Sequence, residues 1–127
     1  MHRMAEIILK RIEEMDHYKG PNAIPGIKFR GARAALGVTA WGMGIIEMEP
    51  GVTGYPEHDH VKDGQEEVYT LLRGTATMKL GDEQIALEPG VFVRVAPAQK
   101  RKILPGPQGC TVLALGSTPG KAYEPRR

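Results

Sequence analysis

Residues 54–69 read GYPEHDHVKDGQEEVY, a polar segment with two histidines near its centre. In an extended chain, side chains two residues apart lie on one face, so His58 and His60 can present two imidazoles to one point. Glu67 begins an alternating strand and shares a face with Tyr69. Two neutral imidazoles and one carboxylate suit a divalent first-row metal and leave coordination positions open. We therefore predict a metal site formed by His58, His60 and Glu67.

Short apolar runs separated by turn residues extend on both sides of this segment. The 16 glycines and 10 prolines are scattered singly, which is typical of turns between strands. We expect strands over residues 27–30, 33–36, 39–49, 67–72, 75–80, 83–87, 91–95, 101–104 and 110–115. Turns are expected at 73–74 and at 105–109, the second closing a last hairpin. This pattern predicts an all-β barrel or sandwich.

The N-terminal region fits two interpretations. Apolar residues between positions 8 and 15 have helical spacing, but residues 7–9 also fit an edge strand followed by a turn, which we favour. The expected organisation is a strand and turn arm over 1–26, a barrel over 27–116 and a polar tail over 117–127. A length of 127 residues suits one such domain.

Composition and charge exclude several classes of protein. The net charge of +2 and a longest basic cluster of three residues, 100–102, do not indicate a nucleic-acid partner. No apolar run approaches the roughly 18 residues of a membrane span. Residues 1–6 lack the pattern of a secretory signal, and the single cysteine, Cys110, cannot form an internal disulfide. We therefore expect a cytoplasmic protein that contacts neither nucleic acid nor membrane.

The histidine segment resembles the first motif of the cupin superfamily, which reads His-x-His, a short gap, Glu, six residues and Gly. Here six residues separate His60 from Glu67, and six more separate Glu67 from Gly74. The second cupin motif opens on a glycine, matched by Gly90, and ends on a histidine that serves as a fourth metal ligand. This chain has Arg101 at that position.

The resemblance covers residues 27–116 and is strongest with small single-domain cupins of unassigned function. It implies a single jelly-roll β-barrel, the cupin fold. Because cupins include dioxygenases, isomerases, decarboxylases, sugar binders and seed storage proteins, the resemblance selects no activity. Whether the chain is an enzyme stays open at this point.

Arg101 leaves two interpretations of the site, because a guanidinium has no lone pair and cannot ligate a metal. In the favoured one, His58, His60 and Glu67 hold a divalent ion (Fe, Mn, Ni or Zn), and Tyr69 and Arg101 contact a small anionic molecule. In the alternative, Arg101 pairs with Glu67 in a metal-free module that binds a small ligand. A purely structural or sensory domain is a third interpretation.

The exposed edges of a small jelly roll also predict self-association. Unpaired strand edges favour pairing with another chain, and the apolar residues 7–9 are able to add a strand to a neighbouring sheet. The resemblance to cupins implies the same, because many cupins associate in this way. We therefore expect a homodimer.

Overall fold

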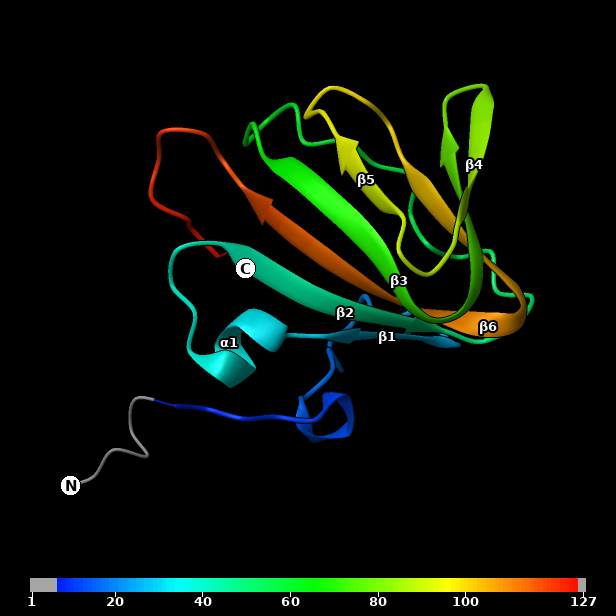
Figure 1. Cartoon of the computed structure of the whole chain (residues 1–127). Coiled ribbons are helices and arrows are strands. Elements are labelled where there is room, and N and C mark those ends of the chain that lie inside the picture. The colour runs from blue at the N-terminus through cyan, green and yellow to red at the C-terminus, as the bar shows by residue number, and fades with distance from the viewer. Residues whose placement is uncertain (1–6, 126–127) are drawn as a thin grey trace.

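Two long antiparallel strands form the centre of the molecule. In the computed structural model, which describes residues 7–125, strand β3 spans Glu66–Leu80 and strand β6 spans Lys102–Ser117. The two strands pair along most of their length. Figure 1 shows them side by side within one strongly curved sheet.

Shorter strands flank this central pair. Strand β2 pairs with β6 and β1 pairs with β2, whereas β4 and β5 both pair with β3, and every pairing is antiparallel. The remaining elements are η2 (Ile12–Glu14), β1 (Ile27–Arg30), α1 (Ala32–Leu36), β2 (Gly42–Met48), β4 (Glu83–Leu87) and β5 (Phe92–Val95). The sheet order is thus β1-β2-β6-β3-β4, with β5 beside β3. The all-β prediction is confirmed.

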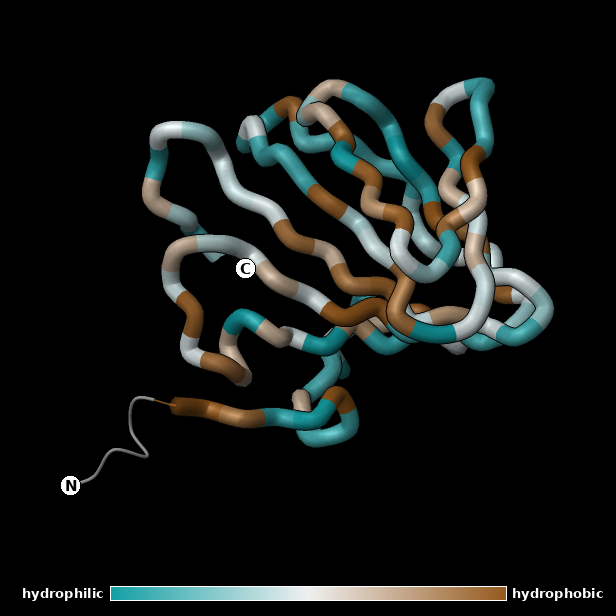
Figure 2. Tube along the Cα trace, viewed as in Figure 1, coloured by the Kyte–Doolittle hydropathy of each residue, from teal (hydrophilic) through white to brown (hydrophobic). Residues whose placement is uncertain are grey.

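Alternate positions of the strands build one main core, because successive side chains of a strand point to opposite faces. Figure 2 shows the resulting mixture of apolar and polar positions along β2, β3 and β6. The core includes Ile46, Met48, Tyr69, Leu71, Met78, Leu87, Val95, Ile103 and Val112. A second, smaller cluster joins Ile45 to Met15 and Ala32, so the N-terminal region and α1 cover the other face of β2.

The turn expected at 73–74 and the hairpin expected at 105–109 are both wrong. Both β3 and β6 run on without reversing, and their pairing is interrupted only by register shifts near Gly74. Gly74 has φ +78°, and a Cβ built on it would lie 2.1 Å from the carbonyl oxygen of Gly109. The glycines therefore bend the paired strands, as at a barrel corner, instead of ending them.

This close approach gives a testable difference between two glycines. Gly74→Ala should lower the free energy of unfolding by about 3 kcal/mol, since backbone strain and a steric clash with Gly109 add together. Gly51→Ala is the matched control: Gly51 has φ +79° but no heavy atom within 4 Å of its built Cβ, so about 1 kcal/mol is expected. Urea unfolding measures both. Equal losses would show that the bend does not depend on this approach.

The strand expected over residues 33–36 is also wrong, because the chain forms helix α1 at Ala32–Leu36. Its sequence, ARAAL, consists of strong helix formers. Gly37 then ends the helix in the left-handed conformation, with φ 75°. Intrinsic propensity therefore outweighed the local pattern of short strands here.

The N-terminal arm does not form the expected strand in residues 7–11, although a 3-10 turn follows at Ile12–Glu14. Residues 1–6 of that prediction lie outside the described part. The side chains of Ile7 and Leu9 are 70% and 81% exposed, and Figure 1 shows this arm leading away from the sheet. A strand needs a paired edge, and among residues 7–125 no strand pairs with residues 7–11. Within residues 7–125, no helix is long and apolar enough to span a membrane.

We propose that the arm packs against a second copy of the chain to form a homodimer. Covering the exposed apolar side chains of an extended segment with another molecule removes them from water, which favours association. Sedimentation at micromolar concentration should show a dimer, and the double variant Ile7→Asp and Leu9→Asp should shift it toward monomer. Lys10→Ala, at an exposed position of the same arm, should leave the dimer intact. A monomeric parent protein would contradict the proposal.

Candidate metal centre

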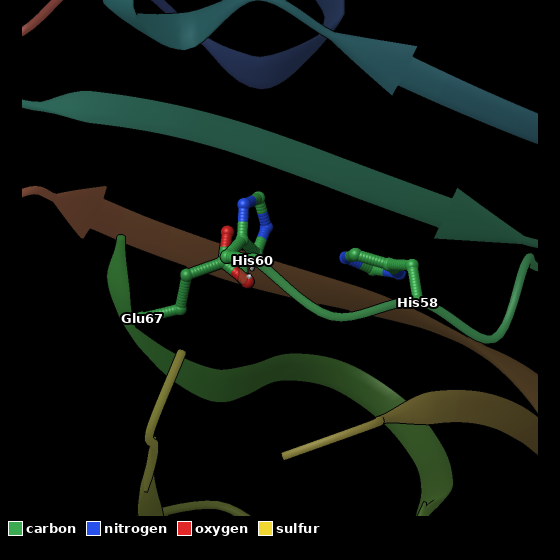
Figure 3. Close-up of side chains that lie close together, drawn as sticks. All are labelled: His58, His60 and Glu67. Carbon is green, nitrogen blue, oxygen red and sulfur yellow. Dashed lines mark ion pairs between the residues drawn. The ribbon is translucent and has the colours of Figure 1, made fainter. Parts of the chain in front are cut away.

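Backbone hydrogen bonds hold the histidine loop against the segment that leads into β6. The His58 amide donates to the Arg101 carbonyl at 3.1 Å, and the Arg101 amide donates back to His58 at 2.9 Å. The His60 amide donates to the carbonyl of Pro97 at 2.8 Å. Glu67 lies on β3 near its start. A loop and a strand therefore bring the three predicted ligands together, as Figure 3 shows.

The three side chains form a compact donor set. One ligand atom from each of His58, His60 and Glu67 lies within 4.8 Å of the others, and His60 Nε2 is 3.2 Å from Glu67 Oε1. Two donors bonded to one first-row ion at about 2.1 Å lie at most about 4.2 Å apart, so a small closing movement suffices. His60 is buried, and the other two are half-buried.

Both imidazoles are oriented through their Nδ1 atoms. His58 Nδ1 donates to the carbonyl oxygen of Pro56 at 3.0 Å, and His60 Nδ1 donates to Asp63 Oδ1 at 3.0 Å. Because these acceptors hold the Nδ1 proton, a neutral ring keeps its lone pair on Nε2, the atom that would bind a metal. Burial lowers the pKa of His58, which favours that neutral form. The donor set thus fits a divalent metal.

The Glu67 carboxylate is the centre of a buried polar network. Its Oε1 atom accepts a hydrogen bond from the Tyr69 hydroxyl at 2.5 Å. The hydroxyls of Tyr55 and Tyr69 interact in turn, and burial raises the pKa of both phenols far above its ordinary value. Both therefore remain protonated donors at neutral pH. Tyr55 belongs to the histidine segment, but its role was missed because its partner lies on β3.

The buried side chain of Arg101 lies next to the carboxylate of Glu67. Its side chain is 0% exposed, and Nη1 is 3.6 Å from Glu67 Oε1. Nη2 donates to the carbonyl of Ala96 at 2.9 Å, whereas Nε and Nη1 have no hydrogen-bond partner within residues 7–125. The guanidinium reaches the site, and its nearest carboxylate is the predicted metal ligand.

A cavity of about 540 Å³ opens beside the donor set. It is lined by Phe29, Gly42, Met43, Gly44, Ile46, Tyr55, Pro56, His58, His60, Gln65, Glu67, Tyr69, Ala114, Gly116 and Tyr123. Of the two residues predicted to contact substrate, Tyr69 lines this cavity and Arg101 does not. An apolar wall with a few convergent polar groups is typical of a small-molecule site. A larger groove of about 800 Å³ contains none of the predicted site residues.

Comparison with solved structures supports the cupin fold of this chain. No family model and no curated protein matches the sequence. Three similar solved structures are a sugar phosphate isomerase of the cupin superfamily from Silicibacter pomeroyi (TM-score 0.71, 16% identity, 84% of this chain and 73% of that one), a cupin protein from Bacteroides fragilis (0.60, 21%, 87% and 92%) and iron(II) HppE (0.63, 14%, 87% and 60%). The chain is a small protein with the cupin jelly-roll fold, as its histidine segment predicts.

Two adjacent glutamates test the site assignment. Glu67 faces the cavity, whereas Glu66 lies on the outer surface and pairs with exposed Arg94. Glu67→Gln should weaken Ni²⁺ binding about tenfold or more, because it removes the anionic ligand, and Glu66→Gln should leave it unchanged. Calorimetric titration of both variants measures the difference. Similar effects in the two variants would exclude Glu67 as a ligand.

Proposed function

We propose that this protein binds a divalent transition-metal ion and uses it to bind or transform a small anionic molecule. The observation that carries the proposal is the orientation of the imidazoles. Pro56 and Asp63 hold the Nδ1 atoms of His58 and His60, so that both Nε2 atoms are available beside Glu67. The fold is shared with an iron(II) protein, HppE, which supports metal chemistry in this architecture.

The residues around the ion would have separate roles. The ion itself would supply Lewis-acid or oxygen-activating chemistry. Three protein ligands leave coordination positions open toward the cavity, where a small molecule can enter. Tyr69 lies on the cavity wall and would contact that molecule, while its hydroxyl group donates its proton to the hydrogen bond with Glu67. Met43 and Ile46 contribute apolar surface to the lining of the same cavity.

A metal-free binding module is the second candidate, and one observation favours it. Arg101 already provides a positive charge 3.6 Å from Glu67 Oε1. An ion pair at this position satisfies the carboxylate without any metal. In that case Tyr69 and the two histidines on the cavity wall would contact the ligand without a metal.

We further propose that the protein is cytoplasmic, because its single cysteine fits a reducing compartment. Cys110 is a free, buried cysteine, and burial raises the pKa of its thiol to about 11. The thiol is therefore protonated and unreactive at neutral pH, and its role is packing in the core.

Metal analysis of the purified protein separates the two candidates. The parent protein should bind one equivalent of Ni²⁺ or Mn²⁺, and the double variant His58→Ala and His60→Ala should bind none while keeping its far-UV circular dichroism. His17→Ala removes a histidine outside the donor set and should bind like the parent. A parent protein that takes up no metal at saturating concentration would favour the metal-free module instead.

A further inference from the structure

Arg101 places a permanent positive charge beside a predicted metal ligand. Its backbone pairs with that of His58 in both directions, so the residue cannot move away without opening the site. Its side chain is fully buried. A guanidinium remains charged at any ordinary pH, and two of its nitrogens have no hydrogen-bond partner in the described part of the chain. Such a buried charge needs compensation.

The compensation comes from Glu67 and not from the cavity. Arg101 does not line the cavity, whereas Glu67 does, and Nη1 of Arg101 is 3.6 Å from Glu67 Oε1. The same oxygen accepts from Tyr69 and lies near His60 Nε2. Glu67 therefore stands between the guanidinium and any small molecule in the cavity.

The charge balance of the site follows from these positions. The negative charge of Glu67 is balanced by Arg101, while the metal-ligating imidazoles and Tyr69 are neutral. Asp63, which contacts His60, also carries a charge near the site, but its side chain is 30% exposed and water screens it more strongly. A divalent ion would therefore keep nearly its full double charge toward the cavity.

We propose that Arg101 is a built-in counter-ion of Glu67, so that this centre binds a metal ion tightly only together with an anionic ligand of the carboxylate class. The inference rests on the proposed function, because it assumes the ligand set of His58, His60 and Glu67. A bare dication near a buried guanidinium is repelled through a weakly screening interior. A carboxylate on the open coordination positions removes that excess positive charge, so the two ligands bind cooperatively.

Titration with Co²⁺, followed by calorimetry and visible absorption, tests this coupling. Sodium acetate should raise the affinity of the parent protein for Co²⁺ by about five- to a hundredfold, and neutral acetamide should not. Arg101→Met should bind Co²⁺ about tenfold more tightly without acetate and should lose most of the acetate effect. Arg101→Lys, which keeps the charge, should show the parent's acetate effect.

Two further variants control for folding and for surface charge. Arg101→Met leaves the half-buried Glu67 without its partner and can fail to fold, so thermal unfolding is measured first. The double variant Glu67→Gln and Arg101→Met removes both charges. It should bind Co²⁺ more weakly than the parent but retain the acetate effect, because the net charge of the site is unchanged. Lys100→Met removes an exposed positive charge one residue away and should change neither quantity.

The outcomes separate this proposal from the one on which it rests. An unchanged acetate effect in Arg101→Met, or its loss in Arg101→Lys and Arg101→Met alike, would overturn the counter-ion role while leaving the metal site in place. A parent protein that binds no Co²⁺ with or without acetate would overturn the proposed function. That outcome would overturn this inference as well, because both rest on the same ligand set.

Discussion

The antiparallel pairing of β3 with β6 is the contact on which the other elements depend. It joins the longest strands of the chain and gives β2, β4 and β5 the edges on which they pair. The bend at Gly74, where the backbone passes close to Gly109, lets both strands curve around one core. Glycine bends of this kind add curvature to the ordinary twist of the sheet and help its apolar face to close around the core.

The same pairing determines where the polar site lies. Glu67 and Tyr69 project from the start of β3, and the segment before β6 holds the histidine loop through the backbone of Arg101. The site therefore lies between the start of β3 and the segment that leads into β6, and a charged arginine is buried within it. Burial of that charge is tolerable because Glu67 and the carbonyl of Ala96 face it.

Local patterns predicted much of the site but little of its surroundings. His58, His60 and Glu67 lie within ten residues, so alternation along an extended chain was enough to place them on one side. The same alternation places the neighbouring Glu66 on the outward face, where it pairs with Arg94. The turns expected at glycines were wrong where a strand only bends, since a glycine with positive φ serves either purpose.

The sequence by itself determined the strand-rich fold and the closeness of His58, His60 and Glu67, because periodicity and short spacings act within a few residues. Only the tertiary structure decided that Arg101 lies behind Glu67 and that Tyr55 joins Tyr69. Both contacts join residues far apart in the chain or on different elements, and their distances depend on how β3 and β6 curve. Burial and charge compensation are properties of that packed arrangement, and no local pattern encodes them.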